Sequence, residues 1–395
     1  MSLLQFSVIE PFRPSSHPPA YGRRIPERGR ESNAFALRIV GFARPAKAQP
    51  FSYRRENICG ILPPHLPHDF FPRTTGQLTR EVELGFQKTV FVVNPHAGNR
   101  STGKAWPRIE TMAADLLGPF ETCVTGGPGD ATRMTRDHLL AGADRIVCVG
   151  GDGTLNEVVN GFLDESGPLR KDAVLGFLPN GTGCDFCRTI PIPTGLEASL
   201  ATLREGHIHT IDLGRIRFRD HAGCTCTRYF HNIASFGLGG EVDDRVNKTS
   251  KACGPFITFL VSTLISLFTY GKKRIRIRVD DGDERTVEVL NVAVANGRYH
   301  GGGMLVAPDA ATDDGLFDVT IIGAMSLPLV FWHLPKLYTG GIKRIRQVSI
   351  LTGQKVTAAS DQRVLLDIDG EQPGTLPAEL TIVPGAINMI MNRTS

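Results

Sequence analysis

Short apolar runs alternate with segments of helical spacing between residues 88 and 214. The apolar runs predict β-strands at 89–93, 120–124, 145–149 and 173–177. The segments between them place apolar side chains three or four residues apart and predict helices at about 105–117, 130–141 and 155–163. Because strands separated by helices form parallel sheets that are covered on both faces, the pattern predicts a doubly wound α/β domain over residues 87–214.

The chain becomes rich in predicted strands after residue 214. The strand patterns lie at 229–233, 273–279, 287–295, 317–322, 348–351 and 364–368. Short strands at this spacing are typical of two packed sheets. Residues 215–395 are therefore predicted to form a β-sandwich-like second domain.

The first 86 residues show neither pattern. They hold 11 of the 26 prolines and 12 of the 44 lysines and arginines, without a sustained helical or strand period. Such a composition predicts a disordered or irregular Pro/Arg-rich extension over residues 1–86. Arginine-rich segments resemble organelle transit peptides, but the acidic residues Glu10, Glu27, Glu31 and Glu56 argue against one, and no apolar run predicts a secretory signal.

Charge and cysteine content argue against a nucleic-acid-binding protein and against a secreted protein with disulfide bonds. The net charge is +4, and residues 1–86 carry more than all of it, so the rest lacks the basic surface of a nucleic-acid-binding protein. Eight cysteines without a secretory signal indicate reduced thiols in the cytoplasm. The spacings Cys184-x-x-Cys187 and Cys224-x-Cys226 fit structural thiols better than a zinc site.

The stretch with the most specific chemistry follows the predicted strand 145–149. It reads Gly150-Gly151-Asp152-Gly153-Thr154-Leu155-Asn156. Glycines let backbone N–H groups approach a phosphate closely, and the N-terminus of the following helix favours negative charge. The turn predicts a nucleotide-phosphate site, with an ordinary strand-to-helix turn as the alternative.

Two more polar loops follow predicted strands of the same sheet. Residues 94–98 follow the first strand, and residues 178–186 follow the fourth. Because the carboxyl ends of parallel strands share one edge, both loops are expected beside the glycine turn. Residues 98–104 nearly match a P-loop, but Ala105 stands where a hydroxyl must reach Mg²⁺, which excludes a Walker-type nucleotidase.

These motifs resemble the catalytic domain shared by diacylglycerol kinases, sphingosine kinases and bacterial YegS-like lipid kinases. The glycine turn matches the family signature GGDGT-(L/I)-NEV, and further family blocks follow in order at 295–304, 307–316 and 366–371. The resemblance covers about residues 88–392 and implies a phosphofructokinase-like nucleotide-binding domain. Cys184 departs from the family pattern, in which an asparagine is usual at this position.

The resemblance implies roles for single residues. The residues expected to bind ATP are Asn94, Pro95, His96, Ala97, Gly98, Thr125, Gly150, Gly151, Asp152, Gly153, Thr154, Leu155, Asn156 and Thr182. Asp152 and Asp185 are expected to carry the catalytic Mg²⁺, directly or through water. Glu371 is expected to take the proton of the lipid hydroxyl, with Asp369 as its support or as the second candidate. A metal ion that shapes the fold would be bound by Asp314 and by the carbonyl groups of Ala311 and Leu316.

The sequence therefore predicts a kinase that transfers the γ-phosphoryl group of Mg²⁺-ATP to a diacylglycerol-like or sphingoid-like lipid. Two alternatives stay open: a small-molecule kinase similar to NAD kinases, and a catalytically idle sensor of nucleotide or lipid. The sequence determines neither the acceptor lipid nor the oligomeric state.

A lipid acceptor stays in a bilayer, so the protein is expected to be cytoplasmic and to touch the membrane surface reversibly. Residues 257–268 form the longest apolar run, which is too short to span a bilayer. The basic residues that follow it are Lys272, Lys273, Arg274, Arg276 and Arg278. We expect the run to form a buried helix rather than to insert into the membrane. A basic strip beside an apolar helix nevertheless suits an anionic lipid surface, so residues 257–268 together with the strip are the candidate membrane contact.

Overall fold

The computed structural model of the protein describes residues 85–180, 183–248, 265–266 and 271–393. Three predictions fall partly or wholly outside these residues. The predicted extension lies outside them up to residue 84, and so does Thr182. The apolar run 257–268 lies outside them except for Ile265 and Ser266.

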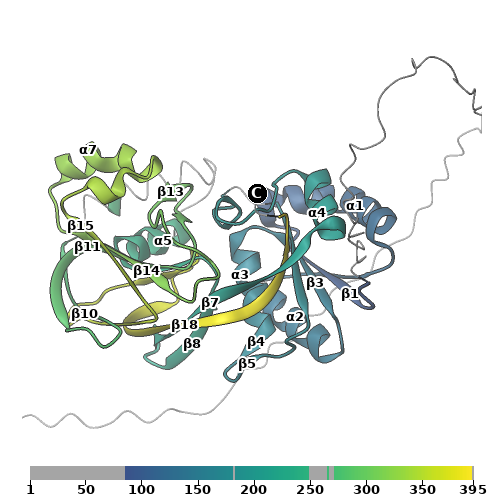
Figure 1. The fold of residues 1–395 in the computed structure, drawn as a ribbon, viewed down its shortest axis with the longest axis horizontal. Helices are drawn as coiled ribbons and strands as arrows, with labels where there is room; N and C mark the ends of the chain where they lie inside the picture. Colours follow the sequence, from purple (N-terminus) through teal and green to yellow (C-terminus); the bar gives the residue numbers. More distant parts are fainter. Residues whose placement is uncertain (1–84, 181–182, 249–264, 267–270, 394–395) are drawn as a thin grey trace, which may run out of the picture. The chain divides into compact units, whose positions relative to one another are not determined.

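Four parallel strands in the order β2-β1-β3-β6 form one end of a long continuous sheet, and this end is called the first sheet below. The strands are β1 (Thr89–Val93), β2 (Glu121–Val124), β3 (Arg145–Gly150) and β6 (Val174–Pro179). β1 and β3 are buried along their whole length, as expected for central strands that are covered on both faces (Figure 1). The carboxyl ends of all four strands lie at the same edge of the sheet, because the strands are parallel.

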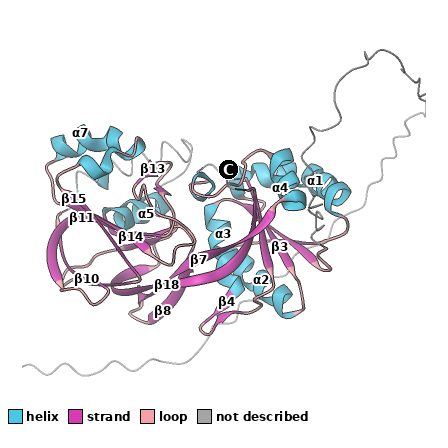
Figure 2. Cartoon of the chain, viewed as in Figure 1, coloured by secondary structure: helices cyan, strands magenta, loops and turns pink. Residues whose placement is uncertain are grey.

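Helices cover both faces of this sheet. Trp106 and Ile109 of α1 pack in one core cluster with Leu200 of α4, whereas Leu139 of α2 packs in the other with Phe162 of α3. The helices are α1 (Ala97–Leu117), α2 (Asp130–Leu140), α3 (Asp152–Phe162) and α4 (Leu196–Glu205). This arrangement confirms the predicted doubly wound α/β fold (Figure 2).

Two long strands continue from the first sheet into the β-rich part of the chain. β7 (His207–Asp220) and β18 (Gly374–Met391) pair with each other in antiparallel fashion. One end of β18 pairs in parallel with β6, and its other end pairs with β16. Figure 1 shows β18 as the yellow strand that runs from one sheet into the other.

The hydrophobic pattern did not predict β18 because prolines interrupt it. Pro377 and Pro384 cannot donate a hydrogen bond to a neighbouring strand. The pairing of β18 with β7 shifts at both places, between Thr375 and Glu379 and between Val383 and Ile387. β18 thus remains one continuous strand, because each proline lies where the pairing with β7 is irregular.

The β-rich part folds around its own core, as predicted. Its strands continue outward from β18 in the order β16-β10-β11-β14-β15, and β9 pairs with β11 and with β17. Phe230, Phe236 and Phe317 are fully buried in this core. The strands are β8 (Thr225–Phe230), β9 (Ile233–Gly237), β10 (Lys273–Val279), β11 (Arg285–Ala295), β14 (Phe317–Gly323), β15 (Val348–Gly353), β16 (Lys355–Ala359) and β17 (Leu366–Ile368).

Short elements complete the described part of the chain. The helices among them are α5 (Leu238–Lys248), α7 (Leu327–Tyr338), η1 (Phe186–Arg188) and η3 (Gly341–Arg344). The two-residue strands are β4 (Leu163–Asp164), β5 (Gly167–Pro168), β12 (Tyr299–His300) and β13 (Met304–Leu305). The hydrophobic pattern predicted no element at α7, a mostly apolar segment that contains two prolines.

The first predicted helix begins earlier than expected. α1 extends back to Ala97, but Gly98, Asn99 and Arg100 adopt positive φ angles within it. The regular helical stretch therefore follows Arg100, close to the predicted start at 105. The irregular turn before it leaves the first polar loop beside the carboxyl end of β1.

We expect Gly214→Ala to lower the stability of the protein. A Cβ atom at Gly214 would lie 2.0 Å from Cζ of Phe230, its partner across the β7–β8 pair. The Phe230 ring stacks on Phe317 in the core and has no free space to move into. Overpacking of this kind costs about 1–3 kcal/mol, which thermal or urea unfolding would detect. Gly195→Ala is the control, because a Cβ atom there meets open space. Equal losses of stability in both variants would contradict this expectation.

Candidate functional site

The three polar loops predicted from the sequence meet at the carboxyl edge of the first sheet. The backbone N–H of Asn94 donates to the carbonyl group of Val149 at 3.0 Å, and that of Asn180 donates to Gly150 at 2.7 Å. The N–H of Thr125 donates to Val93 at 2.9 Å. The ends of the four strands therefore lie beside one another, with the glycine turn after β3 between the loop after β1 and the loop after β6.

Side-chain contacts tie the first loop to the glycine turn. The Nδ2 atom of Asn94 donates to Oγ1 of Thr154 at 2.9 Å, and its Oδ1 accepts the N–H of His96 at 2.9 Å. Gly98 has a φ of 58°, and a Cβ atom there would lie 2.9 Å from the carbonyl oxygen of Asn180. Glycine is therefore required where the first and third loops approach each other.

The carboxylate of Asp152 holds the third loop beside the glycine turn. Asp152 is the first residue of α3, where the partial positive charge of the helix favours a carboxylate. Its Oδ2 accepts the N–H of Asp185 at 3.2 Å, and its Oδ1 accepts that of Phe186 at 3.4 Å. The two aspartates predicted to carry a metal ion are thus brought together.

Asp185 connects these loops to the β-rich part. Its Oδ2 accepts the N–H of Gly302 at 2.7 Å, and its Oδ1 lies 3.6 Å from Nε of Arg188. Burial, with the nearby charge of Asp152, raises the pKa of the Asp185 carboxyl, against the hydrogen bond from Gly302. Oδ1 is buried and has no hydrogen-bond partner among the described residues. An orphaned carboxylate oxygen beside a second carboxylate fits a divalent cation.

Asp369 is buried and saturated with hydrogen bonds. Its Oδ2 accepts Nδ2 of Asn156 at 2.8 Å and the N–H of His231 at 2.9 Å. Its Oδ1 accepts the N–H groups of Asn232 at 3.1 Å and Ile233 at 2.9 Å. Burial raises the pKa of Asp369, but the charge and hydrogen bonds of His231 and the backbone outweigh it, so the net pKa lies below the ordinary value. The residue is held as a carboxylate.

Glu371 lies in a different environment from Asp369. Its Oε2 accepts Nη1 of Arg228 at 2.7 Å, and both side chains are 40 % exposed. A backbone bridge between Ile368 and Glu371 fixes the tight turn that carries it. Of the two carboxylates in this turn, Glu371 is therefore the one that an external molecule can reach.

A second buried carboxylate, which the sequence did not single out, supports the same turn. Asp367 accepts Oγ of Ser235 at 3.0 Å and the N–H of Gly370 at 2.9 Å. Its Oδ2 lies 2.9 Å from Nε2 of His300, whose charge also acts on Asp185. The role of Asp367 becomes visible only from its buried contacts in the folded chain, because an aspartate within a strand has no local sequence signal. Arg228 was missed for the same reason.

Some residues predicted to bind nucleotide have buried side chains. Leu155 is part of the hydrophobic core, and Asn156 is 2 % exposed and faces Asp369 and the carbonyl group of Tyr229. Thr125 and Thr154 are also buried, whereas residues 95–98 lie nearer the surface. The structure therefore brings the glycine turn and the first loop together, but it points the Leu155 and Asn156 side chains inward. Thr182 lies outside the described residues.

The predicted structural metal site lies in the turn before β14. Oδ1 of Asp314 accepts the N–H of Leu316 at 3.0 Å, and Asp212 accepts the N–H of Gly315 at 2.7 Å. Nearby, Oδ2 of Asp318 is buried without a hydrogen-bond partner among the described residues, and burial, with the charges of Asp309 and Asp314, raises its pKa. A carboxylate oxygen without a hydrogen bond at the start of β14, beside this turn, fits a cation. No group of three acidic, histidine or cysteine side chains within the described ranges forms a metal site, and the predicted set needs only one carboxylate.

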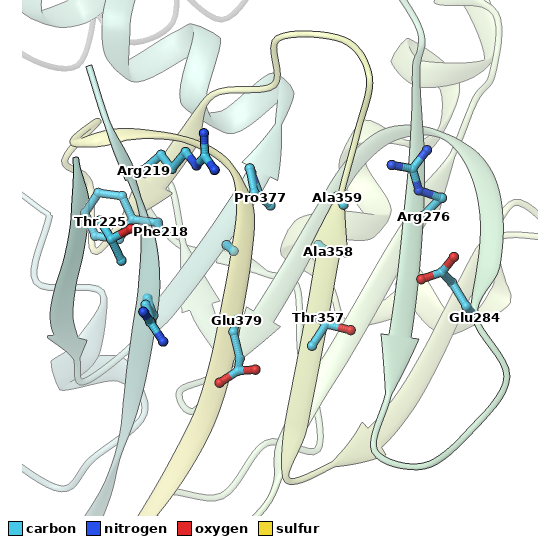
Figure 3. A pocket seen from close by; sticks show the side chains of 12 residues that line it. Phe218, Arg219, Thr225, Arg276, Glu284, Thr357, Ala358, Ala359, Pro377 and Glu379 are labelled. Atoms are coloured by element: carbon cyan, nitrogen blue, oxygen red, sulfur yellow. The ribbon is translucent and has the colours of Figure 1, made fainter. Parts of the chain in front are cut away.

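A pocket of about 340 Å³ lies elsewhere, on the solvent side of β7, β18, β16 and β10 (Figure 3). It is lined by residues such as Arg217, Arg219, Arg276, Glu284 and Glu379. Acidic partners offset part of its positive charge, since Arg276 pairs with Asp361. No residue predicted for the site lines this pocket, so it has no part in the chemistry of the loops.

Two sequence families match the chain. The family described as diacylglycerol kinase catalytic domain matches residues 88–216. The family described as YegS C-terminal NAD kinase beta sandwich-like domain matches residues 232–391. The two matches together span most of the chain, including the first sheet and the β-rich part.

Named relatives and solved structures agree with these matches. A diacylglycerol kinase of Mycobacterium tuberculosis is 27 % identical over 81 % of this chain and 99 % of its own length. A probable lipid kinase YegS-like of Cronobacter sakazakii is 28 % identical over 68 % of this chain and 85 % of its own. The crystal structure of a diacylglycerol kinase from Bacillus anthracis superposes with a TM-score of 0.59 at 22 % identity, covering 78 % of this chain and 98 % of that one, which shows a shared fold.

We expect Asp369→Asn to destabilise the protein at neutral pH. The NH₂ group of the new asparagine would face N–H groups that now donate to the carboxylate, so hydrogen bonds would be lost at a cost of about 3 kcal/mol. Because the folded-state pKa of Asp369 is lowered, its contribution is complete above the unfolded-state pKa of about 3.9 and is lost as pH falls through the folded-state value.

Urea unfolding of both proteins between pH 7 and pH 3 would measure this difference. The difference between wild type and variant should be largest near neutral pH and should shrink at the acid end. Asp361→Asn is the control, because Asp361 is an exposed partner of Arg276 and should change stability by less than about 0.5 kcal/mol. A gap between wild type and Asp369→Asn that widens toward acid would contradict the assignment of a lowered pKa.

Proposed function

Since the chain belongs to the lipid kinases that share the diacylglycerol kinase catalytic domain, we propose that it transfers the γ-phosphoryl group of Mg²⁺-ATP to a lipid hydroxyl. One observation carries the proposal. The glycine turn and the acidic turn, which are far apart in sequence, are joined by the hydrogen bond from Asn156 to Asp369. A phosphate cradle and an accessible carboxylate therefore belong to one site, as phosphoryl transfer requires.

In this proposal, backbone groups hold the triphosphate of ATP. The glycine turn 150–154 and the loop 94–98 lie at the carboxyl edge of the sheet, and the N-terminus of α3 offers backbone N–H groups and partial positive charge there. Thr125 and Thr182 are the further nucleotide contacts that the family resemblance implies. Leu155 and Asn156 take part through the backbone of the turn, because their side chains face inward.

Asp152 and Asp185 would hold the catalytic Mg²⁺, directly or through water. The orphaned Oδ1 of Asp185 and the nearby carboxylate of Asp152 support this role. When bound, the ion offsets the negative charge of the phosphates. A separate ion at Asp314, with the carbonyl groups of Ala311 and Leu316, would fix the turn before β14.

Glu371 would act as the base. Its partly exposed carboxylate would take the proton of the lipid hydroxyl as the hydroxyl oxygen attacks the γ-phosphorus atom. The bond between the γ-phosphorus and the bridging oxygen of ATP would break in the same step, and ADP would leave. Arg228 binds one carboxylate oxygen and thereby orients the group. Asp369 is less suited to this role, because five hydrogen-bond and ion-pair contacts already occupy its buried oxygens.

Diacylglycerol is the proposed acceptor, because several relatives carry the name diacylglycerol kinase. Labelled ATP would be offered with diacylglycerol, a sphingoid base, ceramide, phosphatidylglycerol and NAD in separate reactions. We expect label in diacylglycerol, and label in another lipid would change the acceptor while keeping the reaction class. Label in NAD alone would favour the small-molecule kinase, and no label in any reaction would favour the idle sensor.

We expect Glu371→Gln to lower the rate of lipid phosphorylation by about 10²- to 10⁴-fold, the usual loss when a general base is removed. The amide keeps the size of the side chain, so ATP binding should persist. Initial rates with labelled ATP and a separate nucleotide-binding titration would measure the two effects.

The matched control for this variant is Glu379→Gln. Glu379 is an exposed glutamate that pairs with Lys355 on the outer face of the β-rich sheet, and its loss should leave the rate unchanged. A Glu371→Gln protein that phosphorylates lipid as fast as the wild type would make the base assignment wrong. Asp152→Asn should instead change the concentration of Mg²⁺ that the reaction requires.

A further inference from the structure

Helix α7 is apolar and yet exposed to solvent. Its sequence is Leu-Pro-Leu-Val-Phe-Trp-His-Leu-Pro-Lys-Leu-Tyr, and none of its residues is buried. Trp332 is 76 % exposed and Tyr338 is 52 % exposed. Large aromatic side chains in water are costly in free energy, so a helix of this kind is expected to have a partner.

The surroundings of α7 are basic. Residues 319–360 contain no aspartate or glutamate. Lys336 lies in the last turn of α7, and Lys343, Arg344 and Arg346 are exposed in and just after η3. Lys343 pairs with Asp309, whereas Arg344 and Arg346 have no ion-pair partner within the part of the chain that the structure describes. The partner of α7 is therefore expected to be negatively charged.

The helix also lies close to the proposed site. α7 contacts β13, which directly follows the glycine loop 301–303 (Figure 1). The N–H of Gly302 in this loop is hydrogen-bonded to Asp185. A partner bound to α7 would therefore lie one short strand away from the loop that holds a proposed metal ligand.

The basic strip predicted from the sequence is less suited to an anionic partner. Arg274 pairs with Glu288 at 3.4 Å, Arg276 with Asp361 at 3.1 Å and Arg278 with Glu284 at 3.9 Å. Each of these arginines is thus offset by an acidic side chain. The apolar run that was expected beside them lies outside the described residues, except for Ile265 and Ser266.

We propose that α7, together with Lys336, Arg344 and Arg346, is the surface through which the protein docks on an anionic bilayer. Aromatic side chains prefer the boundary between headgroups and acyl chains, and basic side chains beside them bind anionic lipids. Within the described ranges, no helix has the length and hydropathy needed to cross a membrane. The inference rests on the proposed function in one respect, namely that the acceptor of the reaction resides in this bilayer.

Tryptophan fluorescence reports this docking directly. The chain has two tryptophans, of which Trp106 is 8 % exposed and packs on Phe91, whereas Trp332 lies on α7. Vesicles of phosphatidylcholine with increasing phosphatidylglycerol should shift the emission of Trp332 to shorter wavelength. Lipids brominated near the headgroup should quench it, and the emission of Trp332→Ser should not respond.

Two sets of substitutions separate the apolar and the basic contributions. Trp332→Ser with Tyr338→Ser, and in a second protein Lys336→Gln with Arg344→Gln and Arg346→Gln, should each weaken co-sedimentation with anionic vesicles about tenfold. The basic variant should lose the salt dependence of binding as well. Each affected side chain is at least partly exposed, so both proteins should fold.

Matched controls test whether any exposed apolar or basic group would give the same result. Leu140→Ser removes a 68 % exposed leucine at the end of α2. Lys272→Gln with Lys273→Gln and Arg274→Gln removes three of the five charges of the strip predicted from the sequence. Both controls should bind vesicles as the wild type does. Loss of binding in the strip variant alone would overturn the proposal in favour of the strip.

Other outcomes also decide the matter. The proposal would be overturned if both α7 variants bound vesicles as the wild type does. It would also be overturned if the wild type were a dimer that the α7 variants converted to a monomer without any change in vesicle binding. Glu371→Gln should bind vesicles normally while it fails to phosphorylate lipid, and the α7 variants should still phosphorylate a short-chain acceptor in solution. Failure of the docking surface and failure of the proposed reaction are therefore distinguishable.

Discussion

The buried carboxylate of Asp369 is the interaction on which the rest of the site depends. A carboxylate removed from water is tolerated only when donors replace its hydration. Those donors come from Asn156 in α3 and from the backbone of residues 231–233. Because all of them must converge on one side chain, the glycine turn, the start of β9 and the acidic turn take fixed positions. Glu371, two residues beyond Asp369, is placed by the same convergence.

A second convergence of charge lies at the junction of Asp152 and Asp185. Asp152 keeps the third loop close through two backbone N–H groups, and Asp185 is held by Gly302 of the β-rich part. Like charges at short distance in a partly buried place raise the free energy of the ionised pair. A divalent cation would relieve this cost, which supports the metal-binding role proposed for Asp152 and Asp185. The glycine-rich block at 295–304 thus contacts the proposed metal ligand Asp185 through the N–H of Gly302.

The exposed face of α7 places a third constraint on the same region. Exposure of Trp332 and Tyr338 to water is unfavourable, and contact with a partner that excludes water would remove this cost. Segment 319–360 contains no aspartate or glutamate, which favours an anionic partner. Since α7 contacts β13 beside the glycine loop 301–303, the proposed lipid contact and the phosphoryl-transfer loops lie on connected elements. The β-rich part therefore links the surface where an acceptor would arrive with the carboxylates that would act on it.

The sequence by itself determined the order of the four parallel strands of the first sheet and of the three helices between them, the strand-rich character of the rest, the three polar loops and the family. These features depend on local hydrophobic period and on glycine turn chemistry, which short segments carry alone. Only the tertiary structure decided that β18 continues through Pro377 and Pro384, that Asn156 turns to Asp369, and that Arg228 meets Glu371. The last two contacts join residues 213 and 143 positions apart, and no local pattern encodes which distant side chains become buried together. The compensation of Arg274, Arg276 and Arg278 by acidic partners is likewise a product of strand pairing and connecting turns, because only folding brings those charges within reach.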